Sequence, residues 1–443
     1  MEKQIEKFSD LDSRWSWVVM MACFASLFVV GGTNYSIGLV HNILLTKYND
    51  TQTNTALVGA LHTSISNLAA PLSSILTDRF SVRVAIMTSG FLYTIGFLST
   101  AFVSSLQWSV FTTGVIAGLG GATGWTASMV APSFYFKKYL NTAQGISMAG
   151  NGAGMLGLPP ILSWASSNYG SFGFFVALAS VSIHSIVCGI LIRPSQLEKH
   201  LHEERRARKA VGIEENMFKK YVQVLTTRSV VFYTLSMFFY GCGMYIVFVY
   251  LPNFCIRQGV TEMQASMVIS VCGIASIFGR VIVGFLASFQ SINEIILFSG
   301  SLFCISIATI FFPQFGHTIH GQLIYAAWLG FFFGCPYVTI TPINVTFLGV
   351  GKLAAALGIE LCGCGLGGVI GPIFAGMLAE STDSFGNVFI LGGVTIALSS
   401  TFGFIPYFFK ERHCDSMTIN VDTDNNDDCS PKEKMLLQNS EVT

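Results

Sequence analysis

The chain has 443 residues, of which 52% are hydrophobic and only 11% are charged. Soluble domains carry about a quarter charged residues, so this composition excludes an ordinary soluble fold and indicates a protein of the lipid bilayer. The formal net charge is zero, which excludes the basic surface expected of a nucleic-acid-binding protein.

Twelve apolar runs are long enough to cross a membrane as helices. They lie at 16–45, 55–77, 84–105, 108–132, 141–166, 171–193, 229–254, 264–289, 295–313, 320–346, 353–378 and 386–409. The pattern predicts an all-α polytopic membrane protein with twelve transmembrane helices in two six-helix bundles, at 16–193 and 229–409. We expect no cleavable signal peptide, because the first apolar run is too long and no small-residue cleavage site follows it.

Three polar segments frame the two bundles. Residues 1–15 form a short N-terminus, the charged stretch 194–228 is expected to be a solvated central linker, and the acidic tail 410–443 is expected to be disordered. Lys and Arg gather on the side of both termini, whereas the opposite loops hold only Lys47 and Arg257. This bias predicts a multi-pass protein of the cell membrane with both termini and the linker in the cytoplasm.

The sequence gives no sign of an enzyme. The eleven cysteines lie mostly within apolar runs, without a CxxC pair, and behave as small hydrophobic residues. A catalytic nucleophile with its base, a metal-binding cluster and a phosphate-binding loop are all missing from the pattern of residues. We therefore expect neither catalysis nor a cofactor.

A repeat links the two halves. Residues 140–159 and 353–372 share Leu, Ala, Gly, Ile and Pro positions in register, and both stretches are rich in glycine. A duplicated glycine-rich helix in each half is typical of transporters built from two bundles, although two apolar helices can also share small residues by chance. Gly150 and Gly363 would let a neighbouring helix pack closely or slide, which makes them candidate gating positions.

Three motifs carry a family resemblance. They are Asp12-Ser13-Arg14-Trp15-Ser16-Trp17 before the first span, Tyr135-Phe136-Lys137-Lys138 with Ala143, Gly145, Ala149, Gly150 and Gly154 at the fifth, and Asp78-Arg79-Phe80-Ser81-Val82-Arg83 between the second and third. The first two resemble signatures of the monocarboxylate transporter family, although Arg14, Tyr139 and Leu140 depart from them. The third is similar to the basic loop of the major facilitator superfamily.

The resemblance covers about residues 12–410 and implies a major facilitator fold, alternating access and organic carboxylate substrates, sometimes with a coupled proton. Ion pairing among Asp78, Arg79 and Arg83 could close a cytoplasmic gate. The two arginines could also serve only to set the topology.

Arg280 is the only basic residue predicted deep in a span. An ionisable group inside the membrane is costly and therefore marks a functional site. A guanidinium group binds a carboxylate through two parallel hydrogen bonds, and the family resemblance implies that this arginine binds the substrate carboxylate. The alternative is a structural ion pair with Glu360.

Glu360 is the only acidic residue predicted deep in a span, and it is a candidate proton carrier if it is not merely the counterion of Arg280. His62 is a second candidate for proton coupling, although a lone histidine is more often a packed polar residue. Asn34, Tyr35 and Asn151 complete the candidate substrate-binding residues; the asparagines could equally well bond neighbouring helices.

Two departures from the lactate-type members affect the substrate. Leu39 and Ser276 stand where the resemblance implies a lysine and an acidic residue. The chain therefore looks closer to carriers of aromatic amino acids, thyroid hormones, creatine or carnitine than to a proton-coupled lactate carrier. The sequence leaves open whether the protein has an accessory single-span subunit as a partner.

Two other functions remain as alternatives. One is a carrier of an unrelated solute such as a sugar, which Arg280 argues against. The other is a non-transporting sensor with a transporter fold, and the short linker and tail carry no recognisable signalling domain.

Overall fold

The computed structural model describes residues 8–210, 217–289, 291–382 and 385–408, and all regular structure within these ranges is helical. The predicted tail 410–443 and the first seven residues lie outside them.

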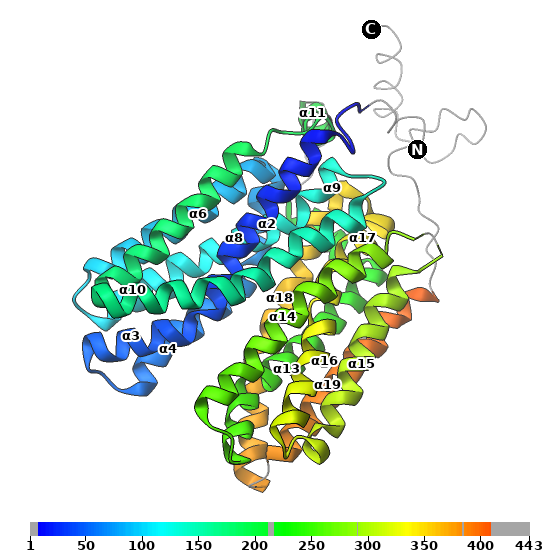
Figure 1. The fold of residues 1–443 in the computed structure, drawn as a ribbon. Coiled ribbons are helices and arrows are strands. Elements are labelled where there is room, and N and C mark those ends of the chain that lie inside the picture. Colours follow the sequence, from blue (N-terminus) through cyan, green and yellow to red (C-terminus); the bar gives the residue numbers. More distant parts are fainter. Residues whose placement is uncertain (1–7, 211–216, 290, 383–384, 409–443) are drawn as a thin grey trace, which may run out of the picture. The chain divides into compact units, whose positions relative to one another are not determined.

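The helices form two successive groups joined by a central pair (Figure 1). The first group contains α2 (Arg14–Tyr35), α3 (Ile37–Tyr48), α4 (Gln52–Leu68), α5 (Ala70–Arg79), α6 (Val82–Phe102), α7 (Leu106–Ser109), the π-helix η1 (Val110–Ala117), α8 (Gly118–Val130), α9 (Pro132–Tyr135) and α10 (Leu140–Leu191). The central pair is α11 (Gln196–Ala210) and α12 (Met217–Thr226). The second group contains α13 (Arg228–Arg257), α14 (Glu262–Leu286), α15 (Glu294–Phe315), α16 (Ile319–Phe333), α17 (Cys335–Leu348), α18 (Val350–Thr382), α19 (Phe385–Phe404) and the 3₁₀ turn η2 (Ile405–Tyr407).

Within the described residues, nine helical stretches are long and apolar enough to cross a membrane. The difference from the twelve predicted runs has local causes. The second run is broken at Ala69, after which α5 begins with Ala70 and Pro71, and the fourth contains the π-helix η1. The fifth and sixth runs join in α10, but Gly170 interrupts that helix with φ 65° and ψ −161°, a conformation that glycine adopts readily.

The two copies of the repeat occupy equivalent places. In the first half, a Cβ atom on Gly150 or Gly154 would overlap the backbone of Phe24 or Phe28 on α2. In the second half, a Cβ atom on Gly367 would overlap the carbonyl group of Phe238 on α13. Each glycine-rich helix therefore packs directly against the first helix of its own half, as small residues allow.

Candidate functional site

Arg280 is buried between the two halves, with 1% of its surface exposed. It lies on α14, where its Nη1 donates to the hydroxyl of Ser276 at 3.0 Å, one turn earlier. Its Nη2 donates to Oδ1 of Asn151 on α10, in the first half, at 3.2 Å. Its Nε is buried without a hydrogen-bond partner among the described residues. The guanidinium group therefore keeps an unused donor at the interface of the halves.

Glycine and aromatic residues make room for this guanidinium group. A Cβ atom on Gly152 would lie 2.9 Å from Nη1 of Arg280, and one on Gly334 would overlap the arginine side chain. The guanidinium carbon lies 5.5 Å from the ring centroid of Phe333, close enough for a cation–π contact.

Aromatic side chains from both halves form a series of ring contacts that starts at Phe333. The ring of Phe333 lies 5.0 Å from that of Phe248, which in turn lies 6.4 Å from Tyr35 of the first half. Tyr337 contacts Trp125 of the first half at 5.4 Å. Single aromatic residues in apolar helices give no sequence signal of their own, so Tyr35 was predicted but this aromatic cluster was not.

The predicted asparagines differ in their placement. Asn151 contacts Arg280, as expected of a residue at the candidate substrate site. Asn34 is half-buried, and its Oδ1 has no partner among the described residues. Asn67, another asparagine that the sequence offers for bonds to substrate or between helices, joins the halves, because its amide donates to the hydroxyl of Tyr245 at 3.0 Å.

Glu360 does not pair with Arg280 among the described ion pairs. It is fully buried on α18, and its Oε2 accepts a hydrogen bond of 2.7 Å from the amide of Asn344 on α17. Its Oε1 is buried without a described partner. The carboxyl group thus lies within the second half, bonded to a neutral amide, so the structural ion pair considered from sequence is not formed here.

His62 lies in the packed interior of the first half. Its Nδ1 lies 3.0 Å from the carbonyl oxygen of Thr113, to which it donates, and its ring stacks against Tyr93 at 6.1 Å. Nε2 is buried without a described partner. These are the contacts of a packed core histidine, and among the described contacts none joins His62 to Arg280.

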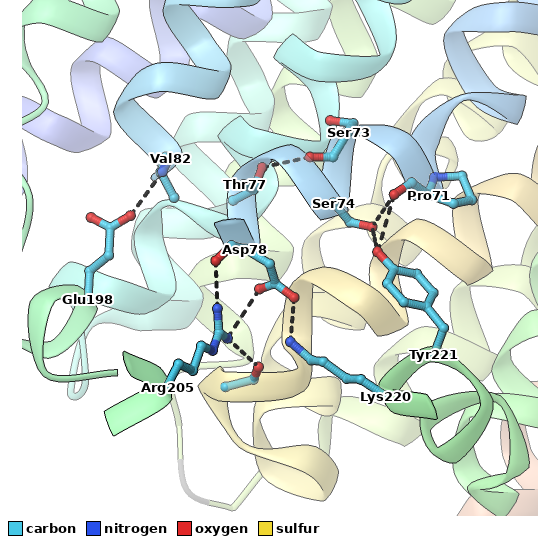
Figure 2. A network of polar contacts seen from close by, with 11 residues as sticks. Pro71, Ser73, Ser74, Thr77, Asp78, Val82, Glu198, Arg205, Lys220 and Tyr221 are labelled. Atoms are coloured by element: carbon cyan, nitrogen blue, oxygen red, sulfur yellow. Dashed lines mark hydrogen bonds and ion pairs between the residues drawn. The ribbon is translucent and has the colours of Figure 1, made fainter. Parts of the chain in front are cut away.

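Asp78 does not pair with Arg79 or Arg83, as a gate formed by these three residues would require, but with residues of the central segment (Figure 2). Asp78 on α5 is ion-paired with Arg205 of α11 at 3.4 Å and with Lys220 of α12. Neither of the two predicted arginines forms an ion pair among the described residues. Arg79 is exposed with its guanidinium over the ring of Phe80, and Arg83 is half-buried.

The central segment supplies these cations, so the prediction of a solvated linker is wrong for its buried residues. Only 4% of Lys220 and 2% of Glu198 is exposed. Oε1 of Glu198 accepts a hydrogen bond of 2.9 Å from the backbone N–H of Val82, at the start of α6. Sequence reasoning could not find these pairs, because a charged stretch does not reveal which of its residues dock.

The repeated glycines face two directions. Gly150 and Gly363, the predicted gating pair, face the first helix of their own half. The glycines that face the opposite half are Gly145, whose Cβ would lie 2.8 Å from the Cα of Gly284 on α14, and Gly365, whose Cβ would lie 2.6 Å from the Cβ of Asn67 on α4.

Comparison with known proteins identifies the family of this chain. The profile of the Major Facilitator Superfamily matches residues 22–359. The chain belongs to this superfamily. It is a multi-pass membrane transporter rather than an enzyme, because its relatives and its fold neighbours are transporters.

Its sequence is similar to monocarboxylate transporters. It is 25% identical over 413 residues to Monocarboxylate transporter 12 of Homo sapiens, covering 88% of this chain and 80% of that protein. It is 27% identical over 401 residues to human Monocarboxylate transporter 11, covering 89% and 83%. The predicted resemblance is therefore confirmed: the chain is a monocarboxylate-transporter-like member of the superfamily.

Solved structures support the major facilitator fold. The Fucose:proton symporter of E. coli superimposes with a TM-score of 0.68 at 14% identity, covering 88% of this chain and 99% of that one. A proton:xylose symporter superimposes with a TM-score of 0.68 at 13% identity, covering 88% and 95%.

Proposed function

We propose that the protein carries a small organic carboxylate or zwitterion across the plasma membrane by alternating access. In this proposal the chain crosses the bilayer twelve times, because the two broken runs and both parts of α10 each span it. Both termini and the central segment face the cytoplasm, as the distribution of Lys and Arg favours.

The observation that carries the proposal is the buried guanidinium group of Arg280. It donates to a neutral amide oxygen of Asn151 and to a hydroxyl group of Ser276. A carboxylate is a stronger acceptor than either, since its hydrogen bonds to the guanidinium are assisted by charge. Substrate would therefore compete with Asn151, and binding would act directly on a contact between the two halves.

The surroundings of the site favour a substrate with a larger body than lactate. Leu39 and Ser276, which stand where the resemblance implies a lysine and an acidic residue, are uncharged, and Ser276 contacts Arg280 through its hydroxyl group. Rings of Phe333, Phe248 and Tyr35 offer an apolar surface instead. Aromatic amino acids, thyroid hormones, creatine and carnitine are the substrates that we would test first.

The gate of the proposed cycle lies where α10 begins. There the hydroxyl groups of Thr142 and Ser288, from opposite halves, lie 2.7 Å apart, and the amide of Asn141 donates to Glu294 at 3.1 Å. Deeper along α10, Gln144 donates to Thr341 of the second half at 3.2 Å. Opening towards the cytoplasm would break these contacts.

Uptake by purified protein in liposomes tests the function. A panel of labelled carboxylates, with lactate and a neutral sugar as comparisons, is measured with and without a pH gradient. We expect saturable uptake of at least one larger carboxylate. Uptake of the sugar alone would replace the proposal with a carrier of another solute, and the absence of any flux would favour a sensor.

A further inference from the structure

We propose that Asn49, at the turn between α3 and α4, is a glycosylation site that carries an oligosaccharide on the non-cytoplasmic face of the membrane. This inference rests on the orientation given in the proposed function, in which both termini face the cytoplasm. It adds a covalent modification, at a place remote from Arg280.

The tripeptide that marks an acceptor asparagine is Asn-x-Ser/Thr, in which x is any residue except proline. It occurs three times in the chain, beginning at Asn34, Asn49 and Asn344. Asn344 is fully buried within α17. The tripeptide at Asn34 ends in Ser36, which is also fully buried, and the hydroxyl group of Ser36 donates to the carbonyl oxygen of Gly32 at 2.6 Å. A sugar chain needs room and water, so the structure leaves only the tripeptide at Asn49.

Asn49 has surroundings that suit an acceptor. It is exposed, and so are the five polar residues that follow it, at 50–54. Its backbone is left-handed, with φ 51° and ψ 39°, a conformation that asparagine can adopt at the end of a helix. Its backbone N–H donates to the carbonyl oxygen of Leu45 at 3.0 Å, but its side chain makes no hydrogen bond among the described residues. The side-chain amide is therefore available for substitution.

The lengths of α2 and α3 place this turn beyond the lipid. α2 has 22 residues and, at about 1.5 Å per residue, a length of about 33 Å, which is enough to cross a hydrocarbon core of about 30 Å. α3 adds 12 residues, or about 18 Å, before Asn49 is reached. Figure 1 shows the hairpin of α3 and α4 at the end of α2 that lies away from α11. The hairpin therefore projects from the face opposite the central segment.

The exposed residues of α3 agree with this position. They are Gly38, Asn42 and Thr46, none of which is a large hydrophobic residue. The exposed face of α6 differs, because it presents large apolar side chains such as Phe91 and Ile95, which suit contact with lipid tails. The surface of α3 is thus one that faces water.

The modification transfers an oligosaccharide from a lipid pyrophosphate, the donor in the membrane where such chains are made. The side-chain nitrogen of Asn49 forms a bond to the anomeric carbon of the first sugar, and the bond from that carbon to the pyrophosphate oxygen breaks. The amide loses one proton, and the lipid pyrophosphate leaves. In the folded chain, the hydroxyl group of Thr51 caps α4 by accepting from the N–H of Asn54 at 3.3 Å.

The test uses the full chain with a C-terminal tag, expressed in animal cells, and compares gel mobility before and after digestion with peptide N-glycosidase. We expect digestion to shift the parent and Thr51→Ser by one step, because both keep the tripeptide and the cap of α4. Asn49→Gln and Thr51→Ala should run at the digested position without digestion. Thr53→Ala, an exposed change on the same hairpin outside the tripeptide, is the matched control and should shift like the parent.

A parent protein whose mobility digestion does not change would overturn the proposal, and so would a shift that persists in Asn49→Gln. An Asn49→Cys variant then separates the glycan from the orientation. If a membrane-impermeant maleimide labels this variant in intact cells more than it labels the parent, the orientation stands and only the glycan is lost. Labelling that appears only after permeabilisation would reverse the orientation as well. Carboxylate uptake is measured separately, so neither result depends on the proposed substrate.

Discussion

At the scale of residues, Arg280 is buried at the contact between the two halves and is the centre of the proposed substrate site. The guanidinium of Arg280 uses one donor on a residue of its own helix and another on Asn151 across the interface. Its position depends on Gly152 and Gly334, which leave the space that it fills. A planar group with several donors is thus held at the contact between the halves.

Replacing Arg280 with alanine or lysine should therefore distinguish the effect of its positive charge from that of its planar shape. We expect Arg280→Ala to lower carboxylate uptake by roughly a hundredfold, since it removes the charged partner of a buried carboxylate. Arg280→Lys should recover little, because an ammonium group does not reproduce the planar fork. Uptake is compared at equal surface expression, measured by biotinylation; an alanine variant with normal uptake would rule out substrate binding by this residue.

Glu198 provides a prediction about pH. Burial raises the pKa of this carboxyl group above its ordinary value of 4.5, although the N–H groups of Val82 and Ser195 and the charge of Arg205 oppose the shift. The folded state then binds the proton more tightly than the unfolded state. The stability that this group contributes is present below the ordinary pKa and is lost as the pH rises through the raised value.

We expect Glu198→Gln to weaken the dependence of thermal stability on pH between mildly acidic and neutral conditions. The amide keeps an oxygen for the N–H of Val82 but cannot titrate. Melting temperatures of purified protein across this range provide the measurement, with Glu203→Gln, an exposed position on the same helix, as control. An unchanged slope in the Glu198 variant would assign the pH dependence to other groups.

At the scale of elements, the repeated glycine helices each use two faces. One face joins the first helix of the same half, through Gly150 and its counterpart Gly363. The other face meets the opposite half, through Gly145 and Gly365. Each helix therefore serves both the rigidity of its bundle and the contact between bundles.

Large side chains at the first face should block transport. We expect Gly150→Leu and Gly363→Leu to abolish uptake, since overpacking a tight interface typically costs about 1–3 kcal/mol. Alanine should distinguish the sites: a Cβ atom on Gly150 overlaps the carbonyl group of Phe24, whereas one on Gly363 lies 3.0 Å from the carbonyl oxygen of Thr234. Gly150→Ala should thus be the more harmful.

The control for these changes is Gly300→Leu on α15, where a Cβ atom would meet nothing within 4 Å. Uptake and melting temperature of each variant are measured side by side. Normal transport by a folded Gly150→Leu or Gly363→Leu variant would mean that close packing of these helices is not needed for the cycle.

The apolar runs predicted the order of the elements, because hydrophobicity over a span is a property of consecutive residues. They could not predict the break at Ala69 or the π-helix at Val110–Ala117, which depend on local backbone geometry. The same limit holds at the site. Arg280 and Glu360 stand out in apolar runs, but their partners Asn151 and Asn344 are set by the packing of helices.

At the scale of the whole molecule, the positions of Arg280 and Glu360 bear on energy coupling. Arg280 bonds across the interface, whereas Glu360 bonds to Asn344 within the second half. Among the described residues, Glu360 therefore has no direct hydrogen bond to the candidate substrate site. This separation supports facilitated diffusion or weak proton coupling over tight symport.

We expect an inward proton gradient alone to drive little or no uphill uptake in liposomes. If accumulation occurs, Glu360→Gln should remove its dependence on pH and leave exchange of substrate intact, because a neutral amide resembles the protonated acid. Strong accumulation that survives this change would place the proton site elsewhere, and His62 would be the next residue to replace.

The two cations that pair with Asp78 lie on different helices, Arg205 on α11 and Lys220 on α12, and this has a consequence for biosynthesis. The ribosome completes Asp78 well before Lys220, so the first half enters the bilayer without one of the two cations that neutralise this carboxylate. Arg205 lies on the helix that directly follows the first bundle, and it is in place before any of the second bundle is made. The order of synthesis thus gives the nascent first half a partner for its acidic residue before the second half is made.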